Sequence, residues 1–100
     1  MKRARFVTAA RLEYLAEIVY YTDAQPGLGH RFAQAVEDAI SRALFYPTAG
    51  APSPARTRRV FLKGFPFAIY YRPEAEGIVV FAVAHQARKP GYWISRARSR

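Results

Sequence analysis

The chain of 100 residues is long enough for one domain with one modest hydrophobic core. It contains no cysteine, which excludes a disulfide framework and a cysteine-ligated metal site. No apolar run approaches the roughly 18 residues of a membrane span, and no apolar signal segment follows the basic N-terminus, so we expect a cytoplasmic protein with no membrane contact. The formal net charge is +9, and residues 51–100 carry ten basic and two acidic side chains, against six and five in residues 1–50. A basic half suits a nucleic acid or an acidic protein as partner, although a merely solvated surface would show the same balance.

Two helices are predicted in the first half of the chain. Apolar residues recur at steps of three and four over residues 9–23, which predicts an amphipathic helix with Glu13 and Glu17 on its polar face. Its apolar row is formed by Leu12, Leu15, Ala16, Val19 and Tyr20. The break Gln25-Pro26-Gly27 precedes a second helix over residues 28–46, whose period is the clearest in the chain. Such a short break predicts an antiparallel helical hairpin.

The period changes from 3.6 to 2 after the second helix. Three prolines and one glycine in residues 47–57 predict a loop. Strands are predicted at residues 57–63, 67–73 and 77–85, and the last is apolar on both faces, which places it centrally in its sheet. Turn residues between these strands predict an antiparallel meander. The tail, residues 86–100, is basic and aromatic and has no clear period.

With a short strand at residues 5–7, the predicted order is β-α-α-β-β-β. This order predicts a single α+β domain over residues 1–100, in which a helical hairpin packs on one face of an antiparallel sheet. We expect the second helix and the sheet to form the core, through Phe32, Val36, Ile40 and Leu44 on the helix and Ile69, Tyr71 and Val80 on the strands.

Three local patterns of this sequence resemble the ParE/RelE superfamily of toxins. The first runs from Arg31-Phe32 to Leu44, is closed by Tyr46-Pro47 and is followed by Gly50. The second is Phe65-Pro66-Phe67-Ala68-Ile69-Tyr70-Tyr71-Arg72, similar to the family's F-P-Y-x-I-x-Y-R strand. The third is Val83-Ala84-His85-Gln86-Ala87-Arg88-Lys89-Pro90-Gly91-Tyr92-Trp93, similar to its V-x-H-x-x-R-x-P-x-x-W ending. Together, in this order and spacing, they cover nearly the whole chain with the element order of that fold.

The resemblance implies the toxin of a type II toxin-antitoxin system, of the kind that stabilises plasmids, held inactive by a cognate antitoxin. ParE-like members poison DNA gyrase and perform no chemistry of their own, whereas RelE-like members are ribosome-dependent mRNA endonucleases. We favour the ParE-like branch because of the ending and the basic tail, and because residues 47–63 contain no Asp or Glu to serve as a base. The alternatives are an endonuclease with the ribosome and mRNA as its targets, and an inactive relative that only forms a complex.

An endonuclease would need a base, cations to hold a phosphate, and a proton donor. The candidates for these roles are Arg72, His85, Lys63, Arg88 and Tyr92. The plainer alternative for Arg72 is an ion pair with Glu74 or Glu76, and for His85 a bond to backbone. A basic cluster including Arg56, Arg58, Arg59 and Lys63 would be needed where a carboxylate is missing, but strand alternation separates Arg58 from Arg59 by face.

Another set of side chains is expected to contact the target or the antitoxin, and it consists of Arg56, Arg58, Arg59, Arg88, Tyr92, Trp93, Arg96 and Arg98. Tyr92 and Trp93 can instead cap the open end of the core. We expect an acidic, disordered antitoxin segment that meets the basic half with its charges and exposed aromatics such as Tyr14, Tyr21 or Trp93 with its apolar residues. The two histidines are isolated from each other, so we expect no metal site. The chain has no Gly-rich phosphate loop, so we expect no cofactor.

Overall fold

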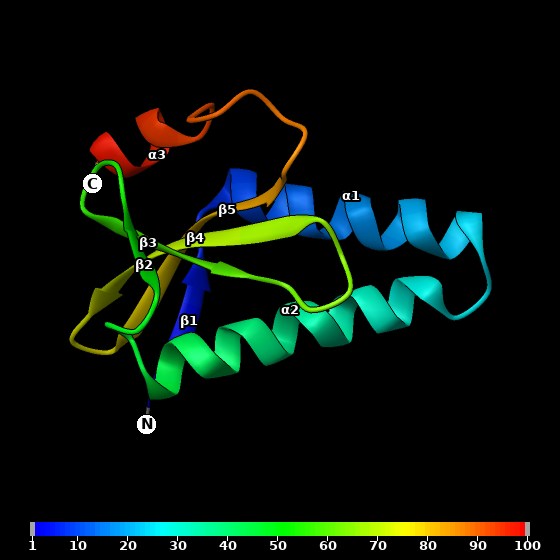
Figure 1. Cartoon of the computed structure of the whole chain (residues 1–100), viewed down its shortest axis with the longest axis horizontal. Coiled ribbons are helices and arrows are strands. Elements are labelled where there is room, and N and C mark those ends of the chain that lie inside the picture. The colour runs from blue at the N-terminus through cyan, green and yellow to red at the C-terminus, as the bar shows by residue number, and fades with distance from the viewer. Residues whose placement is uncertain (1, 100) are drawn as a thin grey trace.

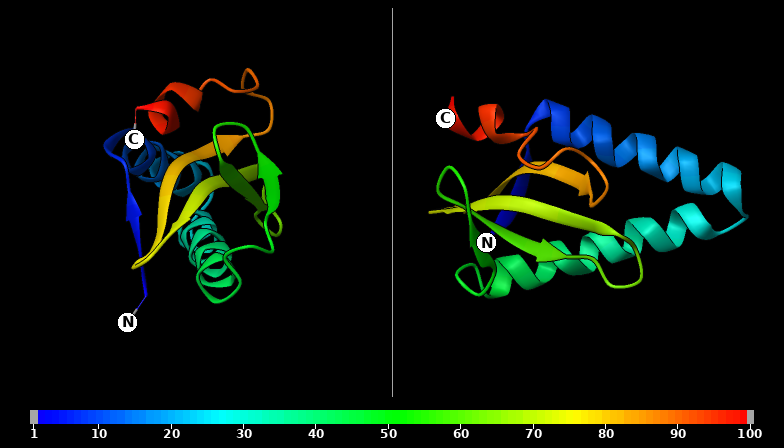
Figure 2. Two further views of the ribbon diagram at one scale, coloured as in Figure 1. Left: turned by 90° about the vertical axis from the view of Figure 1, so that its left-hand side faces the viewer. Right: turned by 45° about the horizontal axis from the view of Figure 1, so that its top comes forward.

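Two long helices cover one face of a five-stranded sheet in the computed structural model, which describes residues 2–99 (Figure 1). A short third helix near the C-terminus packs on the opposite face (Figure 2). The elements are β1 (Arg3–Phe6), α1 (Thr8–Ala24), α2 (Leu28–Phe45), β2 (Ala51–Ser53), β3 (Thr57–Phe61), β4 (Phe67–Glu74), β5 (Gly77–His85) and α3 (Ile94–Arg98). The predicted α+β class is confirmed. Within residues 2–99, no helix is long and apolar enough to cross a membrane.

Three strands form the predicted antiparallel meander, but the sheet as a whole is mixed. Its order is β1-β5-β4-β3-β2, and β1 lies parallel to β5, with Arg3 opposite Gly77 and Phe6 opposite Val80. The prediction of a wholly antiparallel sheet is therefore wrong at this edge. β1 leads directly into α1, so no hairpin joins it to β5, and a long crossover connection permits the parallel pairing. Gly77 has φ +141° here, and a Cβ at this position would collide with the backbone of Arg3.

Two elements lie where the sequence predicted none. β2 falls within the predicted loop at residues 47–57 and pairs with β3 over three residues at the edge of the sheet. α3 spans five residues of the tail. Elements this short contain too few residues to show a period, so their presence depends on the neighbouring chain that supports them.

α2 buries the apolar row that its period predicts. It begins after Gly27, which adopts the left-handed conformation with φ +82°, and ends at Phe45, two residues before Pro47. The buried residues that it shares with the sheet include the expected Phe32, Val36, Ile40, Ile69, Tyr71 and Val80. Leu44 lies at the margin of this core, half-buried rather than enclosed.

α1 turns its predicted apolar row to solvent, so the predicted orientation of this helix is wrong. The exposed fractions are 60% for Leu12, 50% for Leu15, 59% for Val19 and 63% for Tyr20. The opposite face packs on the core through Ala10, Tyr14, Ile18 and Tyr21. Both faces are apolar, so periodicity alone does not choose between them. The inner face is the one whose aromatic rings pack against other aromatic rings. The ring centroids of Tyr21 and Phe32 lie 5.1 Å apart, and those of Tyr14 and Phe6 lie 5.7 Å apart.

Truncation of one residue on each long helix tests this arrangement. Ile40 is 5% exposed, so Ile40→Ala should lower the free energy of unfolding by about 2–5 kcal/mol. Leu15 is 50% exposed, so Leu15→Ala should cost less than about 1 kcal/mol. Urea denaturation of the two variants beside the unmodified chain measures both values. Equal losses would contradict the orientation of α1.

Candidate binding site on the outer face of the sheet

The face of the sheet turned away from α1 and α2 carries a hollow, here termed the outer hollow. It has a volume of about 260 Å³ and lies between β3, β4, the end of β5 and the segment that follows His85. Its floor includes Ala68 and Ala84, which lie opposite each other in the register of β4 and β5. Side chains this small leave room above the sheet for a group of a bound partner.

Three cationic side chains line the outer hollow: Arg59 from β3, and Arg88 and Lys89 from the segment after β5. Among the residues that the structure describes, no carboxylate lines it. The Arg59 guanidinium lies 4.9 Å from the centroid of the Phe61 ring, and that of Arg88 lies 3.9 Å from the centroid of the Tyr92 ring. Stacking of this kind orients a guanidinium and leaves its N–H groups at the edge for an anion. The outer hollow is therefore suited to a phosphate or a carboxylate.

One hydrogen-bond donor at this site has no acceptor. The Nε atom of Arg59 is buried, and nothing within residues 2–99 accepts a hydrogen bond from it. A buried polar atom left in this state costs roughly 1–3 kcal/mol. Because this Nε is buried, an acceptor oxygen of a partner could reach it only if the Arg59 side chain moved.

His85 ends β5 at the rim of the outer hollow, and its ring is held by the backbone. Its Nδ1 accepts a hydrogen bond from the Ala87 N–H at 2.9 Å, which assigns the proton of the neutral imidazole to Nε2. The ring centroid also lies 4.9 Å from that of Phe67 in an edge-on contact. One ring nitrogen is thus engaged and the other already carries a proton, so the ring is not set to accept a proton from a substrate.

Trp93 belongs to a second buried cluster rather than to the surface. It is 2% exposed and stacks on Tyr70 with 4.3 Å between ring centroids. The buried residues that share this cluster are Val79, Phe81, Ala82, Ala84 and Ala97. Trp93 therefore caps the outer face of the sheet, and only its margin lines the outer hollow.

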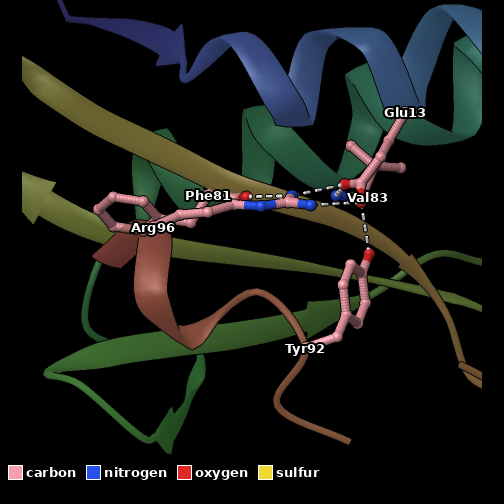
Figure 3. A network of polar contacts seen from close by, with 5 residues as sticks. All are labelled: Glu13, Phe81, Val83, Tyr92 and Arg96. Carbon is pink, nitrogen blue, oxygen red and sulfur yellow. Dashed lines mark hydrogen bonds and ion pairs between the residues drawn. The ribbon is translucent and has the colours of Figure 1, made fainter. Parts of the chain in front are cut away.

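Glu13 of α1 holds the tail on the sheet (Figure 3). Its carboxylate accepts four hydrogen bonds: from the Val83 N–H at 3.1 Å, from the Tyr92 hydroxyl at 2.6 Å, and from both terminal nitrogens of Arg96 at 3.1 and 3.0 Å. The side chains of Glu13 and Arg96 are only 15% and 22% exposed. Burial and the Glu13 carboxylate raise the pKa of the Tyr92 phenol. Arg96, expected as a contact residue, is thus committed to the fold.

This network also closes an edge of the sheet. β1 ends opposite Val80, so β5 continues beyond the strand that pairs with it. Arg96 donates to the Phe81 carbonyl at 3.0 Å, and Glu13 accepts from the Val83 N–H. Two side chains from α1 and α3 thus satisfy backbone groups that a longer β1 would have satisfied.

Arg58 and Arg72 stabilise loops and do not line the outer hollow. Arg58 donates to the carbonyls of Thr48 and Gly50. Arg72 donates to the carbonyls of Ala55, Arg56 and Ala97, and its guanidinium lies 4.9 Å from the centroid of the Phe81 ring. Glu74, an expected partner of Arg72, accepts two hydrogen bonds from Arg5.

The outer hollow brings together part of the expected set, namely Arg59, His85, Arg88, Tyr92 and the margin of Trp93. Lys63 lies beside α2 instead, and Arg56 and Arg98 are exposed elsewhere. Sequence reasoning missed Phe61, Tyr70, Lys89 and Glu13. Strand alternation could have identified Phe61 and Tyr70. Phe61 lies two positions from Arg59, and Tyr70 two positions from Arg72, so each points to the same face as that arginine. In residues 2–99, no cluster of three or more His, Cys, Asp or Glu could hold a metal ion.

Comparisons with known proteins agree with this architecture. The model of the family described as "ParE toxin of type II toxin-antitoxin system, parDE" matches residues 6–90. Among solved structures, a chain of a chromosomal ParDE toxin-antitoxin system from P. aeruginosa is similar, with a TM-score of 0.71 and 18% sequence identity. The similarity covers 85% of this chain and 96% of that one, and at this identity it shows a shared fold. A comparison with curated protein sequences gave no match.

The hydrogen bond at His85 makes a spectroscopic prediction. At neutral pH the imidazole nitrogens of His85 should give the NMR pattern of the tautomer protonated at Nε2, because Nδ1 accepts the Ala87 N–H. Long-range nitrogen–proton correlation spectra distinguish the tautomers. His30 is exposed and serves as the internal control, with the averaged pattern of a solvated ring. A proton on Nδ1 of His85 would show that the ring is free to act as a base.

Proposed function

The chain belongs to the family of ParE toxins of type II toxin-antitoxin systems, and from this premise we propose that it binds DNA gyrase and stalls it on cleaved DNA. The observation that carries the proposal is the composition of the outer hollow, which combines cations and aromatic rings with no carboxylate among its described lining residues. Such a surface can bind a partner, but none of its described lining residues is a carboxylate that could serve as a general base. A toxin that acts by binding alone needs nothing more.

The alternative, a RelE-like mRNA endonuclease, is favoured by one specific observation. Arg59, His85, Arg88 and Tyr92 converge on one hollow, as a phosphate-cleaving site would require. Among the described residues around the hollow, this alternative lacks a free group that could accept the proton. The nearest carboxylate to Tyr92 is that of Glu13, whose two oxygens already accept four hydrogen bonds, and Nδ1 of His85 is engaged. An inactive relative that only forms complexes is the third possibility.

We also propose that an acidic, disordered segment of a cognate antitoxin neutralises the toxin. Cations that line the outer hollow, together with the exposed Arg56 and Arg98, offer it a basic surface. Tyr14 and Tyr21, the expected apolar contacts, are only partly exposed, because both rings pack against the core. The exposed row on α1 replaces them in this proposal, with Leu12, Val19 and Tyr20 each more than half exposed.

Assays with purified components separate gyrase poisoning from RNA cleavage. The toxin should convert plasmid DNA to the linear, gyrase-linked form in the presence of DNA gyrase, and it should leave mRNA intact in a translating ribosome mixture. His85→Gln, which removes acid-base function, should keep gyrase poisoning within about threefold, because action by binding needs no proton transfer and Nδ1 of His85 is already engaged by the Ala87 N–H. If the unmodified toxin cleaves mRNA, and His85→Gln loses both this cleavage and growth arrest, the endonuclease would replace the gyrase proposal.

Binding kinetics across a salt series test the antitoxin proposal. Association should slow markedly between low and physiological ionic strength, because exposed charges are screened over about 8–10 Å there. Leu15→Glu should instead accelerate dissociation, since it places a charge in the apolar row of α1. The purified antitoxin segment and surface plasmon resonance give both rates. An association rate independent of salt would mean that the basic surface is reserved for the target.

A further inference from the structure

We propose that Glu13 is a positioning residue of the outer hollow. From α1 it holds Tyr92 and Arg96 (Figure 3). Through the Tyr92 ring it orients the Arg88 guanidinium, which lines the hollow. The inference rests on the proposed function, in that it takes the outer hollow as a surface through which the toxin acts. Glu13 itself lies outside that surface.

The hydrogen-bonding capacity of the Glu13 carboxylate is fully used. A carboxylate has about four acceptor sites, and four donors occupy them. Glutamine would offer one oxygen and turn an N–H group toward the remaining donors, which already carry hydrogens. Aspartate is one methylene shorter and would draw away from Tyr92 and Val83. The site is therefore specific for glutamate.

The path from Glu13 to the outer hollow runs through one ring. The Tyr92 hydroxyl donates to Glu13 at 2.6 Å, which fixes the direction in which the ring points. The guanidinium of Arg88 lies 3.9 Å from the centroid of this ring, and that of Arg96 lies 5.2 Å from it. Arg88 is exposed, so the stack on Tyr92 restrains a side chain that would otherwise sample many rotamers. The Glu13 carboxylate also offsets one of the two positive charges around the ring.

Loss of the carboxylate would leave the tail with unsatisfied groups. The Val83 N–H would lose its acceptor, and the largely shielded Arg96 would lose its counter-charge. Lifting the tail away from β5 would return both groups to water. It would also uncover Trp93, which is the only tryptophan in the chain and is 2% exposed. Fluorescence of this single residue therefore reports whether the tail is docked.

The first experiment asks whether Glu13 docks the tail. In Glu13→Ala, Trp93 emission should shift to longer wavelength and acrylamide quenching should rise several-fold, while far-ultraviolet circular dichroism keeps its helical signal. Glu17→Ala removes the same charge from the same helix, outside the network, and should leave Trp93 unchanged. If Glu13→Ala loses its helical signal, Tyr92→Phe serves in its place, since it removes one hydroxyl. If the emission and quenching of Trp93 in Glu13→Ala equal those of the unmodified chain, the proposal is overturned.

The second experiment asks whether Glu13 acts through Arg88. The toxin level needed for growth arrest is measured for Glu13→Gln, Arg88→Gln and the double variant, with soluble protein quantified in each culture. Each single variant should require roughly tenfold more toxin, and the double variant hardly more than either, because both remove the same interaction. If the increases in required toxin level multiply in the double variant, or if Arg88→Gln has no effect, Glu13 does not act through Arg88. If the unmodified toxin arrests growth without affecting gyrase, the proposed target is wrong. The comparison of the single and double variants would still test the role of Glu13.

Discussion

The most demanding constraint in this structure is a strand that is apolar on both faces. In β5, Ile78 and Val80 face the helices while Val79 and Phe81 face outward, and all four are buried. Burial of apolar surface is worth about 25 cal/mol per Å², so such a strand is stable only when both of its faces are covered. α1 and α2 cover one face. Trp93 and the residues after it cover the other, so the tail belongs to the fold.

The outer hollow lies where this second cover ends. Tail residues pack over the outward side chains of β5. Toward His85 the floor includes the small side chains of Ala68 and Ala84, and the chain that passes above it forms no helix. The charges divide in the same way. Arg58, Arg72 and Arg96 bind carbonyl or carboxylate groups of the chain itself, whereas Arg59, Arg88 and Lys89 line the hollow. The basic half of the sequence therefore contributes to folding and, in our proposal, also to recognition.

Local patterns were sufficient for the parts of the fold that depend on near neighbours. The row of α2 could be predicted because only one of its faces is apolar, and the meander because alternation and turn residues lie within a few positions of one another. α1 shows the limit of this reasoning. Its two faces are both apolar, and the choice between them was made by aromatic rings contributed from β1 and α2.

Residues close together in the chain specify the α+β class, the helical hairpin, the three-stranded meander and the patterns typical of the toxin family, so these features could be predicted without a structure. The parallel pairing of β1, the docking of the tail and the position of Glu13 depend on contacts that only the folded chain contains. The Glu13 partners Val83, Tyr92 and Arg96 lie 70, 79 and 83 residues further along the chain. No local period records contacts over such separations, because they exist only once β5 has a helix on one side and the tail on the other.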